Sequence, residues 1–137
     1  MRQILLFAAL AASLALLSGC TLSKAKADTA EDMSDKAAYH KLSAEEAYEM
    51  MASQEVVVVD VRTREEYDGG HIENAVLVPN ESIGSEMPEV LPDKEATLLV
   101  YCRSGRRSKD AVQKLLALGY QSVYDFGGVI DWPYELV

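Results

Sequence analysis

The sequence has little of the residues that bind metals or cross-link small proteins: two cysteines and two histidines among 137 residues, scattered along the chain. This scarcity excludes a disulfide-rich fold and leaves no set of residues with metal-ligand spacing. Basic residues are also few, 13 against 22 acidic ones, for a formal net charge of −9. That balance argues against a nucleic-acid partner and against recruitment to anionic lipid by charge. The length suits one domain.

An apolar run, Ile4 to Leu17, follows the basic Arg2 and precedes small residues at positions 18 and 19. A basic start, an apolar stretch and a small-residue cleavage site are the layout of a secretory signal peptide. As a helix this run reaches only ~21 Å, short of the ~30 Å hydrocarbon core, so a spanning helix is the weaker interpretation. Residues 1–19 are therefore predicted to be a signal peptide.

The end of that segment, Leu17-Ser18-Gly19-Cys20, resembles the lipobox of bacterial lipoproteins. The resemblance implies that Cys20 receives a diacylglyceryl group and becomes the first residue of the processed protein. The polar residues 21–37 then form a flexible tether, reaching about 20–25 Å as a random coil. The expected location is the cell envelope, lipid-anchored on the extracytoplasmic side of a bacterial membrane. The alternative is an ordinary signal peptide with an incidental cysteine.

Beyond residue 37, strand-like and helix-like segments alternate. Strands are expected at 56–59, 75–78, 97–101 and 123–125. Helices are expected at 44–52, 63–67, 81–87 and 106–118, with another short one near the C-terminus. This alternation predicts an α/β fold with a mostly parallel central sheet and helices on both faces. Ligands bind such sheets at the carboxyl ends of the strands.

The loop after the expected strand 97–101 concentrates the basic residues. It runs Cys102-Arg103-Ser104-Gly105-Arg106-Arg107-Ser108, and Lys109 follows. A tight loop that enters a helix directs its backbone N–H groups inward and forms an anion-binding nest, which Gly105 makes sterically accessible. These donors, the helix N-terminus and the guanidinium groups favour the thiolate form of Cys102. The loop is therefore predicted to hold a nucleophilic sulfur beside an anion.

Plainer interpretations of this loop exist. Cys102 is alternatively a buried, inert thiol at a strand end, and the arginines belong to a solvated helix start. Cations at a helix N-terminus oppose the helix dipole, however, so three arginines there indicate a compensating anion.

Several motifs within residues 38–137 resemble those of single-domain members of the rhodanese family of sulfurtransferases. They are Asp60-Val61-Arg62 followed by Glu65-Glu66-Tyr67, the segment Gly70-His71-Ile72-Glu73-Asn74-Ala75, the loop 102–108, and Gly127-Gly128 with Trp132. Two departures accompany them. Asn74 replaces the usual glycine, at small cost because asparagine tolerates a left-handed conformation. The sequence also ends five residues after Trp132, so the final helix is shortened.

The resemblance implies a two-step sulfur transfer. The Cys102 thiolate attacks the outer sulfur of a donor such as thiosulfate, expels sulfite and becomes a persulfide, which passes its sulfur to a thiol or cyanide. Residues of the loop bind the substrate: Arg103, Ser104, Gly105, Arg106, Arg107 and Ser108. Among them Arg103 and Arg107 are the expected charge partners, and Arg106 is expected to face solvent and steer substrate. No metal or organic cofactor is implied, because the cysteine carries the sulfur.

Four residues outside the loop are expected to support it. Asp60 and Arg62 are predicted to tie down a loop at a strand end, paired with Glu66. His71 is predicted to be a hydrogen-bonded turn histidine, with a proton relay as the alternative.

Two other functions remain open. The first is a rhodanese-fold module that binds anions or partner thiols without turnover. The second is a phosphatase or arsenate reductase, but such enzymes use C-x5-R. Here Ser108 stands at the position of that arginine and Arg107 comes one residue earlier, which makes a smaller loop.

Overall fold

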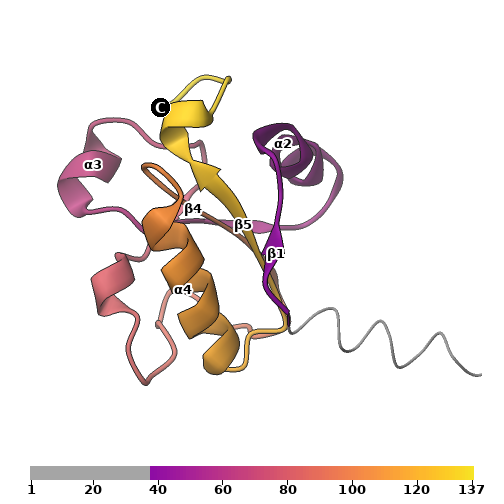
Figure 1. The fold of residues 1–137 in the computed structure, drawn as a ribbon, viewed down its shortest axis with the longest axis vertical. Coiled ribbons are helices and arrows are strands. Elements are labelled where there is room, and N and C mark those ends of the chain that lie inside the picture. The colour runs from indigo at the N-terminus through magenta and orange to yellow at the C-terminus, as the bar shows by residue number, and fades with distance from the viewer. Residues whose placement is uncertain (1–37) are drawn as a thin grey trace, which may run out of the picture.

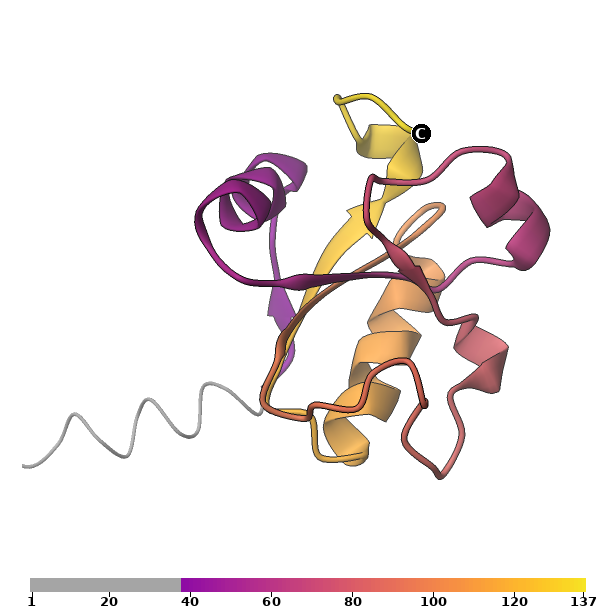
Figure 2. The ribbon, with the colours of Figure 1, turned by 180° about the vertical axis from the view of Figure 1, so that it is seen from behind.

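The computed structural model describes residues 38–137, so the predicted signal peptide, Cys20 and the tether lie outside the described residues. Five parallel strands form one sheet in the order β1-β5-β4-β2-β3 (Figures 1 and 2). The strands are β1 (His40–Lys41), β2 (Val57–Asp60), β3 (Val76–Leu77), β4 (Thr97–Cys102) and β5 (Ser122–Gly128). The predicted α/β class and parallel sheet are confirmed.

Three α-helices connect these strands. They are α2 (Ala44–Ser53), α3 (Arg64–Asp68) and α4 (Arg106–Ala117), with short 3₁₀ turns η1 (Asn80–Ser82) and η2 (Val129–Asp131). The first two begin with reciprocal capping boxes, in which a side-chain oxygen at the cap accepts from the amide three residues on. Each box stabilises a helix too short to persist by propensity alone.

Two details of the secondary structure differ from the prediction. The helix expected over 81–87 is wrong: η1 ends at Ser82, and only Ile83 is buried in the stretch that follows, so no apolar stripe holds a helix there. The two-residue strand β1 was not predicted. Its partner is Tyr124 and Asp125 of β5, a tertiary pairing that two half-polar residues do not signal by their own pattern.

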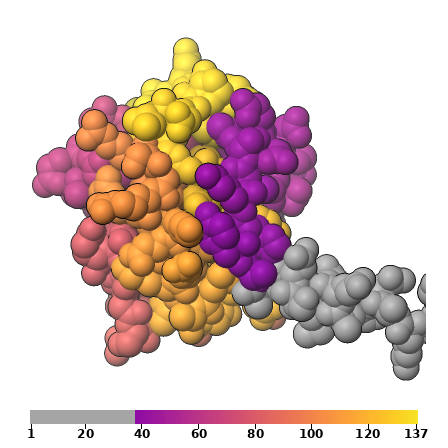
Figure 3. Space-filling view, viewed as in Figure 1, coloured from indigo at the N-terminus to yellow at the C-terminus, as the bar shows by residue number. Residues whose placement is uncertain are grey.

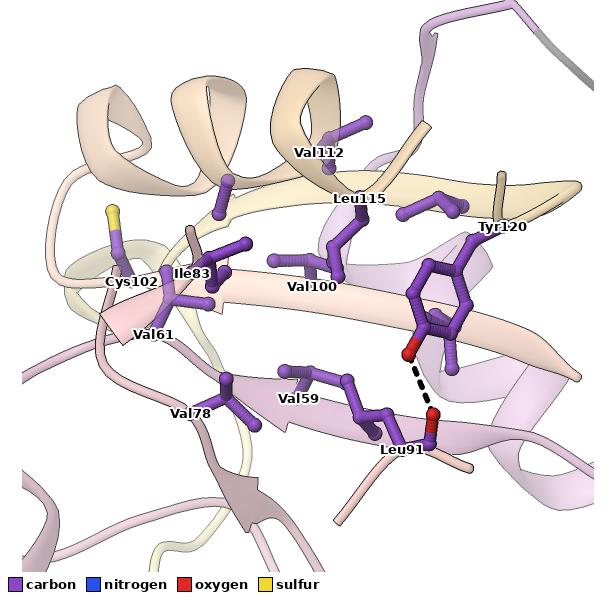
Figure 4. Packing of buried hydrophobic residues seen from close by; sticks show 13 residues of the cluster. Val59, Val61, Val78, Ile83, Leu91, Val100, Cys102, Val112, Leu115 and Tyr120 are labelled. Atoms are coloured by element: carbon purple, nitrogen blue, oxygen red, sulfur yellow. Dashed lines mark hydrogen bonds between the residues drawn. The ribbon is translucent and has the colours of Figure 1, made fainter. Parts of the chain in front are cut away.

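Alternation along β4 divides the core into two layers. Leu98, Val100 and Cys102 face α4 and pack in one buried cluster, whereas Leu99 and Tyr101 face α2 and belong to another. Figure 4 shows the first cluster, with Cys102 at the end of the sheet where α4 begins. Helices therefore cover both faces of the sheet. No helix among residues 38–137 combines the length and the apolar character needed to cross a bilayer.

Candidate active site

Cys102 is the last residue of β4, at the carboxyl edge of the sheet. The side chain is 1% exposed, and its Sγ accepts a hydrogen bond from the backbone N–H of Gly105 at 3.0 Å. The amides of Arg106 and Arg107 follow in the first turn of α4, where a helix has no internal acceptor for its N–H groups. The sulfur thus lies where backbone donors and the positive end of a helix dipole favour a negative charge.

Glycines shape the loop around this sulfur. Gly105 has φ of 94° at the start of α4, a left-handed conformation that a side chain would strain. A Cβ on Gly128 would overlap the carbonyl oxygen of Arg103, so the loop lies directly on the end of β5. That carbonyl also accepts from the N–H of Ile130 at 3.2 Å. The Gly127-Gly128 pair therefore leaves room for the loop to pack on β5, although the two segments are far apart in sequence.

The basic residues of the loop divide into two groups. Arg103, Arg106 and Lys109 are exposed. Arg107 is half-buried, and its guanidinium donates to both carboxylate oxygens of Glu66 in α3, at 2.7 and 2.8 Å. These hydrogen bonds lower the pKa of Glu66 to about 2. Because Arg107 is already paired with a carboxylate, the exposed cations are the ones left to attract an incoming anion.

The predicted partner of Glu66 is wrong. Glu66 was expected to pair with Asp60 and Arg62, but its carboxylate binds Arg107 and thereby joins α3 to α4. Arg62 is occupied elsewhere.

Asp60 and Arg62 form a buried ion pair on the opposite face of the sheet from Cys102. Arg62 donates to Asp60 at 2.6 Å and to the carbonyl of Gly70 at 2.8 Å, and the Tyr101 hydroxyl donates to the same carboxylate at 2.6 Å. Burial opposes the charge of Arg62, but the hydrogen bonds to Asp60 outweigh it and raise the pKa of Arg62. The pair anchors the segment that follows α3.

His71 lies in that segment. Its Nδ1 is 3.0 Å from the carbonyl oxygen of Tyr67, and the two rings stack with centroids 3.6 Å apart. Its backbone exchanges two hydrogen bonds with Val137. Asn74, which stands at the position of the family glycine, has φ of 63°, the left-handed conformation expected of it.

A row of buried, hydrogen-bonded polar side chains beside Cys102 was not predicted from the sequence. The Cys102 thiol donates to Ser108 Oγ at 3.7 Å, and Ser108 donates to Asp125 Oδ1 at 2.7 Å. Asp125 also accepts from the Tyr39 hydroxyl at 2.6 Å and from the N–H of Gly127 at 2.9 Å. Burial, with a smaller contribution from Asp125, raises the pKa of Tyr39 to about 12. An acidic residue at the carboxyl end of an expected strand was the available signal.

A pocket lies at the surface beside these polar side chains. It has a volume of about 470 Å³ and lies between the loop, the end of β5 and the segment that leads into β1, with Lys41, Ser104 and Lys109 on its walls. Figure 3 shows the two sides of this region, with the indigo surface of the β1 segment bordering the orange surface of α4.

The described part of the chain offers one free thiol, Cys102. Within residues 38–137 no three His, Cys, Asp or Glu side chains are grouped closely enough to hold a metal ion. The chemistry that the site can support is therefore that of a nucleophilic sulfur in an anion-binding loop.

Comparisons with known proteins agree with this geometry. The family model described as "Rhodanese-like domain" matches residues 43–133. The tRNA uridine(34) hydroxylase of Yersinia pestis (strain Pestoides F) is 33% identical over 98 residues, covering 68% of this chain and 28% of that protein. The chain thus spans little more than a quarter of the length of that relative.

Solved structures of similar size resemble the chain along most of their own length. A rhodanese-like domain protein from Staphylococcus aureus is 32% identical with a TM-score of 0.61, covering 72% of this chain and 96% of that one. The human single-domain sulfurtransferase TSTD1 is 27% identical with a TM-score of 0.61, covering 67% of this chain and 93% of that one.

Proposed function

This chain belongs to the rhodanese-like domain family, and we propose that it is a sulfurtransferase that carries sulfane sulfur on Cys102 as a persulfide. The observation that carries the proposal is the position of Cys102 Sγ, which accepts from the Gly105 N–H at 3.0 Å at the start of α4. The similarity to a human protein named as a single-domain sulfurtransferase supports it.

The first step loads the cysteine. Arg103 and Arg106 attract a small anionic donor such as thiosulfate to the loop. The Cys102 thiolate attacks the outer sulfur of the donor, so that a bond forms between Sγ and that sulfur. The sulfur–sulfur bond within the donor breaks, and its electron pair leaves with sulfite. Backbone N–H groups of the loop stabilise the charge on the persulfide sulfur.

The second step unloads it. A thiolate or cyanide attacks the outer sulfur of the persulfide, and Cys102 leaves as the thiolate that began the cycle. The cysteine itself carries the sulfur, so the cycle needs neither metal nor organic cofactor. The acceptor is the second small-molecule partner.

Phosphate chemistry fits the loop less well. A C-x5-R loop directs its arginine at phosphate, whereas Ser108 occupies that position here and contacts Asp125. The arginine one residue earlier, Arg107, already binds Glu66. These contacts support a loop for a sulfur-sized group in preference to phosphate or arsenate.

Mass spectrometry tests the proposal directly. Incubation of the full chain with thiosulfate should add one sulfur atom to Cys102, and cyanide should then remove it as thiocyanate. Cys102→Ala should abolish both the adduct and the turnover. Cys20→Ala is the matched control, because it removes the other cysteine and should leave the adduct intact. If no sulfane donor gives an adduct while iodoacetamide still alkylates Cys102, the sulfurtransferase proposal is overturned and a binding module is indicated.

We also propose that the protein is lipid-anchored at Cys20 on the extracytoplasmic side of a bacterial membrane. The motif Leu17-Ser18-Gly19-Cys20 at the end of an apolar segment supports this proposal. Two or more acyl chains give stable anchoring, where one gives marginal binding. Wild-type protein should fractionate with membranes and bear lipid on Cys20, and Cys20→Ala should release it. Unlipidated, freely soluble wild-type protein would contradict the anchor without affecting the chemistry at Cys102.

A further inference from the structure

Asp125 is a buried carboxylate that the sulfur-transfer steps do not use. It is 2% exposed, yet none of the ion pairs among residues 38–137 includes it. Its partners are three neutral donors: the Tyr39 hydroxyl, the Gly127 N–H and the Ser108 hydroxyl. A buried charge without a cation is costly. Its position beside a nucleophile makes it a candidate for a role in the reaction.

Ser108 connects this carboxylate to the nucleophile. A serine hydroxyl has one hydrogen, and three acceptors surround it: Asp125 Oδ1 at 2.7 Å, the Gly105 carbonyl at 3.0 Å and the Gly127 carbonyl at 3.3 Å. The charged and nearest acceptor is Asp125, so the hydrogen lies toward it. A lone pair of Ser108 Oγ then faces Cys102, whose thiol hydrogen it accepts at 3.7 Å.

We propose that Asp125 is a positioning residue that receives the proton of the Cys102 thiol through Ser108. In this step the S–H bond breaks, and its hydrogen forms a new O–H bond on Ser108. The former hydroxyl hydrogen of Ser108 moves to Asp125 Oδ1. The electron pair of the S–H bond stays on sulfur, and nothing is oxidised or reduced.

The transfer reverses the direction of both hydrogen bonds. Ser108 now donates to the thiolate, which gains a second donor beside the Gly105 N–H, and the protonated Asp125 donates to Ser108. The negative charge moves from the buried carboxyl group to the sulfur, so the net charge of the site stays the same. The thiolate forms without a new charge being buried.

Neighbouring groups set the balance of this exchange. On the side of Cys102, Arg107 interacts with the sulfur charge but is held by Glu66. On the side of Asp125, Tyr39 donates to the carboxylate, and Lys109 Nζ lies 5.9 Å from the centre of the Tyr39 ring. The Tyr39 and Gly127 donors favour the negative charge on Asp125, whereas the Gly105 N–H favours it on Sγ.

The pH profile of Cys102 alkylation tests the proposal. The inference rests on the proposed function only in taking Cys102 as the nucleophile. The rate of iodoacetamide labelling is measured on the full chain from about pH 3 to about pH 10, a range that brackets ordinary carboxyl and thiol groups. The peptide that contains Cys102 is read by mass spectrometry, so that labelling of Cys20 is not counted. The wild-type rate should rise in two steps, because Cys102 and Asp125 share one negative charge over the middle of the range.

Two variants remove the shared charge in different ways. Asp125→Asn keeps the size of the side chain but cannot take the proton, so its profile should rise in one step. Ser108→Ala removes the bridge and should lower the plateau of the first step, because the thiolate is left with the Gly105 N–H alone whereas Asp125 keeps the Tyr39 and Gly127 donors. The matched control is Asp110→Asn, which removes an exposed carboxylate of α4 that binds Lys114 and should keep both steps.

The outcomes separate the two proposals. A two-step profile in Asp125→Asn, or a single-step profile in the wild type, would overturn the relay. If Asp125→Asn does not fold, as judged by circular dichroism, the test passes to Ser108→Ala. A first-step plateau of the alkylation rate that is unchanged in Ser108→Ala would then overturn the relay. Alkylation needs no sulfur donor, so a two-step profile together with no persulfide would sustain the relay and reject the sulfurtransferase. A persulfide together with a one-step profile would sustain the sulfurtransferase and reject the relay.

Discussion

The two faces of the sheet each bury a carboxylate near the carboxyl ends of its strands, and they treat it differently. On the α2 face, Asp60 is neutralised by Arg62 at 2.6 Å and capped by the Tyr101 hydroxyl. On the α4 face, Asp125 accepts only from neutral donors and is linked through Ser108 to Cys102. A paired carboxylate holds a loop in place. A carboxylate without a cation can exchange its charge with a neighbour.

The comparison also separates rigidity from reactivity. The α2 face fixes the segment after α3 through Arg62 and Gly70, and its aromatic side chains pack around Trp132. The α4 face supports the nucleophile with glycine contacts and a helix N-terminus. We therefore expect substitutions on the α2 face to cost more stability than those on the α4 face, where the larger effect should be on chemistry.

The largest effect on stability is expected from Arg62→Met. Removing the guanidinium leaves Asp60 buried and unpaired, which should cost about 3–5 kcal/mol of unfolding free energy. Urea denaturation measures the loss. Arg64→Met is the matched control, because its ion pair with Asp68 is exposed and 3.8 Å long, and it should cost less than about 1 kcal/mol. Equal losses in the two variants would contradict the structural role assigned to the α2 face.

Tyr39→Phe should have an intermediate effect. It removes one of three donors to Asp125, a hydrogen bond to a charged group worth about 1.5–3 kcal/mol. Because the carboxylate keeps two donors, the loss should be smaller than that of Arg62→Met by the same denaturation assay. Tyr48→Phe, at an exposed tyrosine, is the control and should change stability little. A Tyr39→Phe variant as unstable as Arg62→Met would mean that the two carboxylates are held alike.

The smallest effect is expected at the ion pair between α3 and α4, Glu66 with Arg107. The pKa of Glu66 falls from its ordinary 4.5 to about 2. The ion pair with Arg107 therefore stabilises the fold fully at pH values above 4.5. That contribution is lost as the pH falls from 4.5 toward 2. Glu66→Gln should remove about 1 kcal/mol at neutral pH, since the pair is partly exposed.

The pH dependence of that loss is the sharper test. Glu66→Gln and wild type should converge in stability as the pH approaches 2, by urea denaturation across the acid range. Glu49→Gln, at an exposed position of α2, is the control. A difference between Glu66→Gln and wild type that persists at the acid end would rule out the carboxylate as its source.

Much of the fold was predictable because its signals are local. The apolar runs of β2 and β4 and the apolar stripe of α4 mark buried elements by their own periodicity, and the residues of the capping box at Ser43 mark a helix start. The strand β1 carries no such signal, because its two residues become a strand only by pairing with β5. The helix expected over 81–87 failed for a different reason, since only Ile83 is buried in the stretch after η1 and no apolar stripe holds a helix there.

The site was predictable in part. The sequence alone determined that Cys102 follows a buried strand, that Gly105 comes next in a basic loop, and that a helix begins there, because each is a property of adjacent residues. Only the tertiary structure decided that Arg107 binds Glu66 and that Asp125 reaches Cys102 through Ser108. Those partners are separated by 41 and 17 positions along the chain. Such contacts depend on how β5 and α3 lie against α4, which no local pattern specifies.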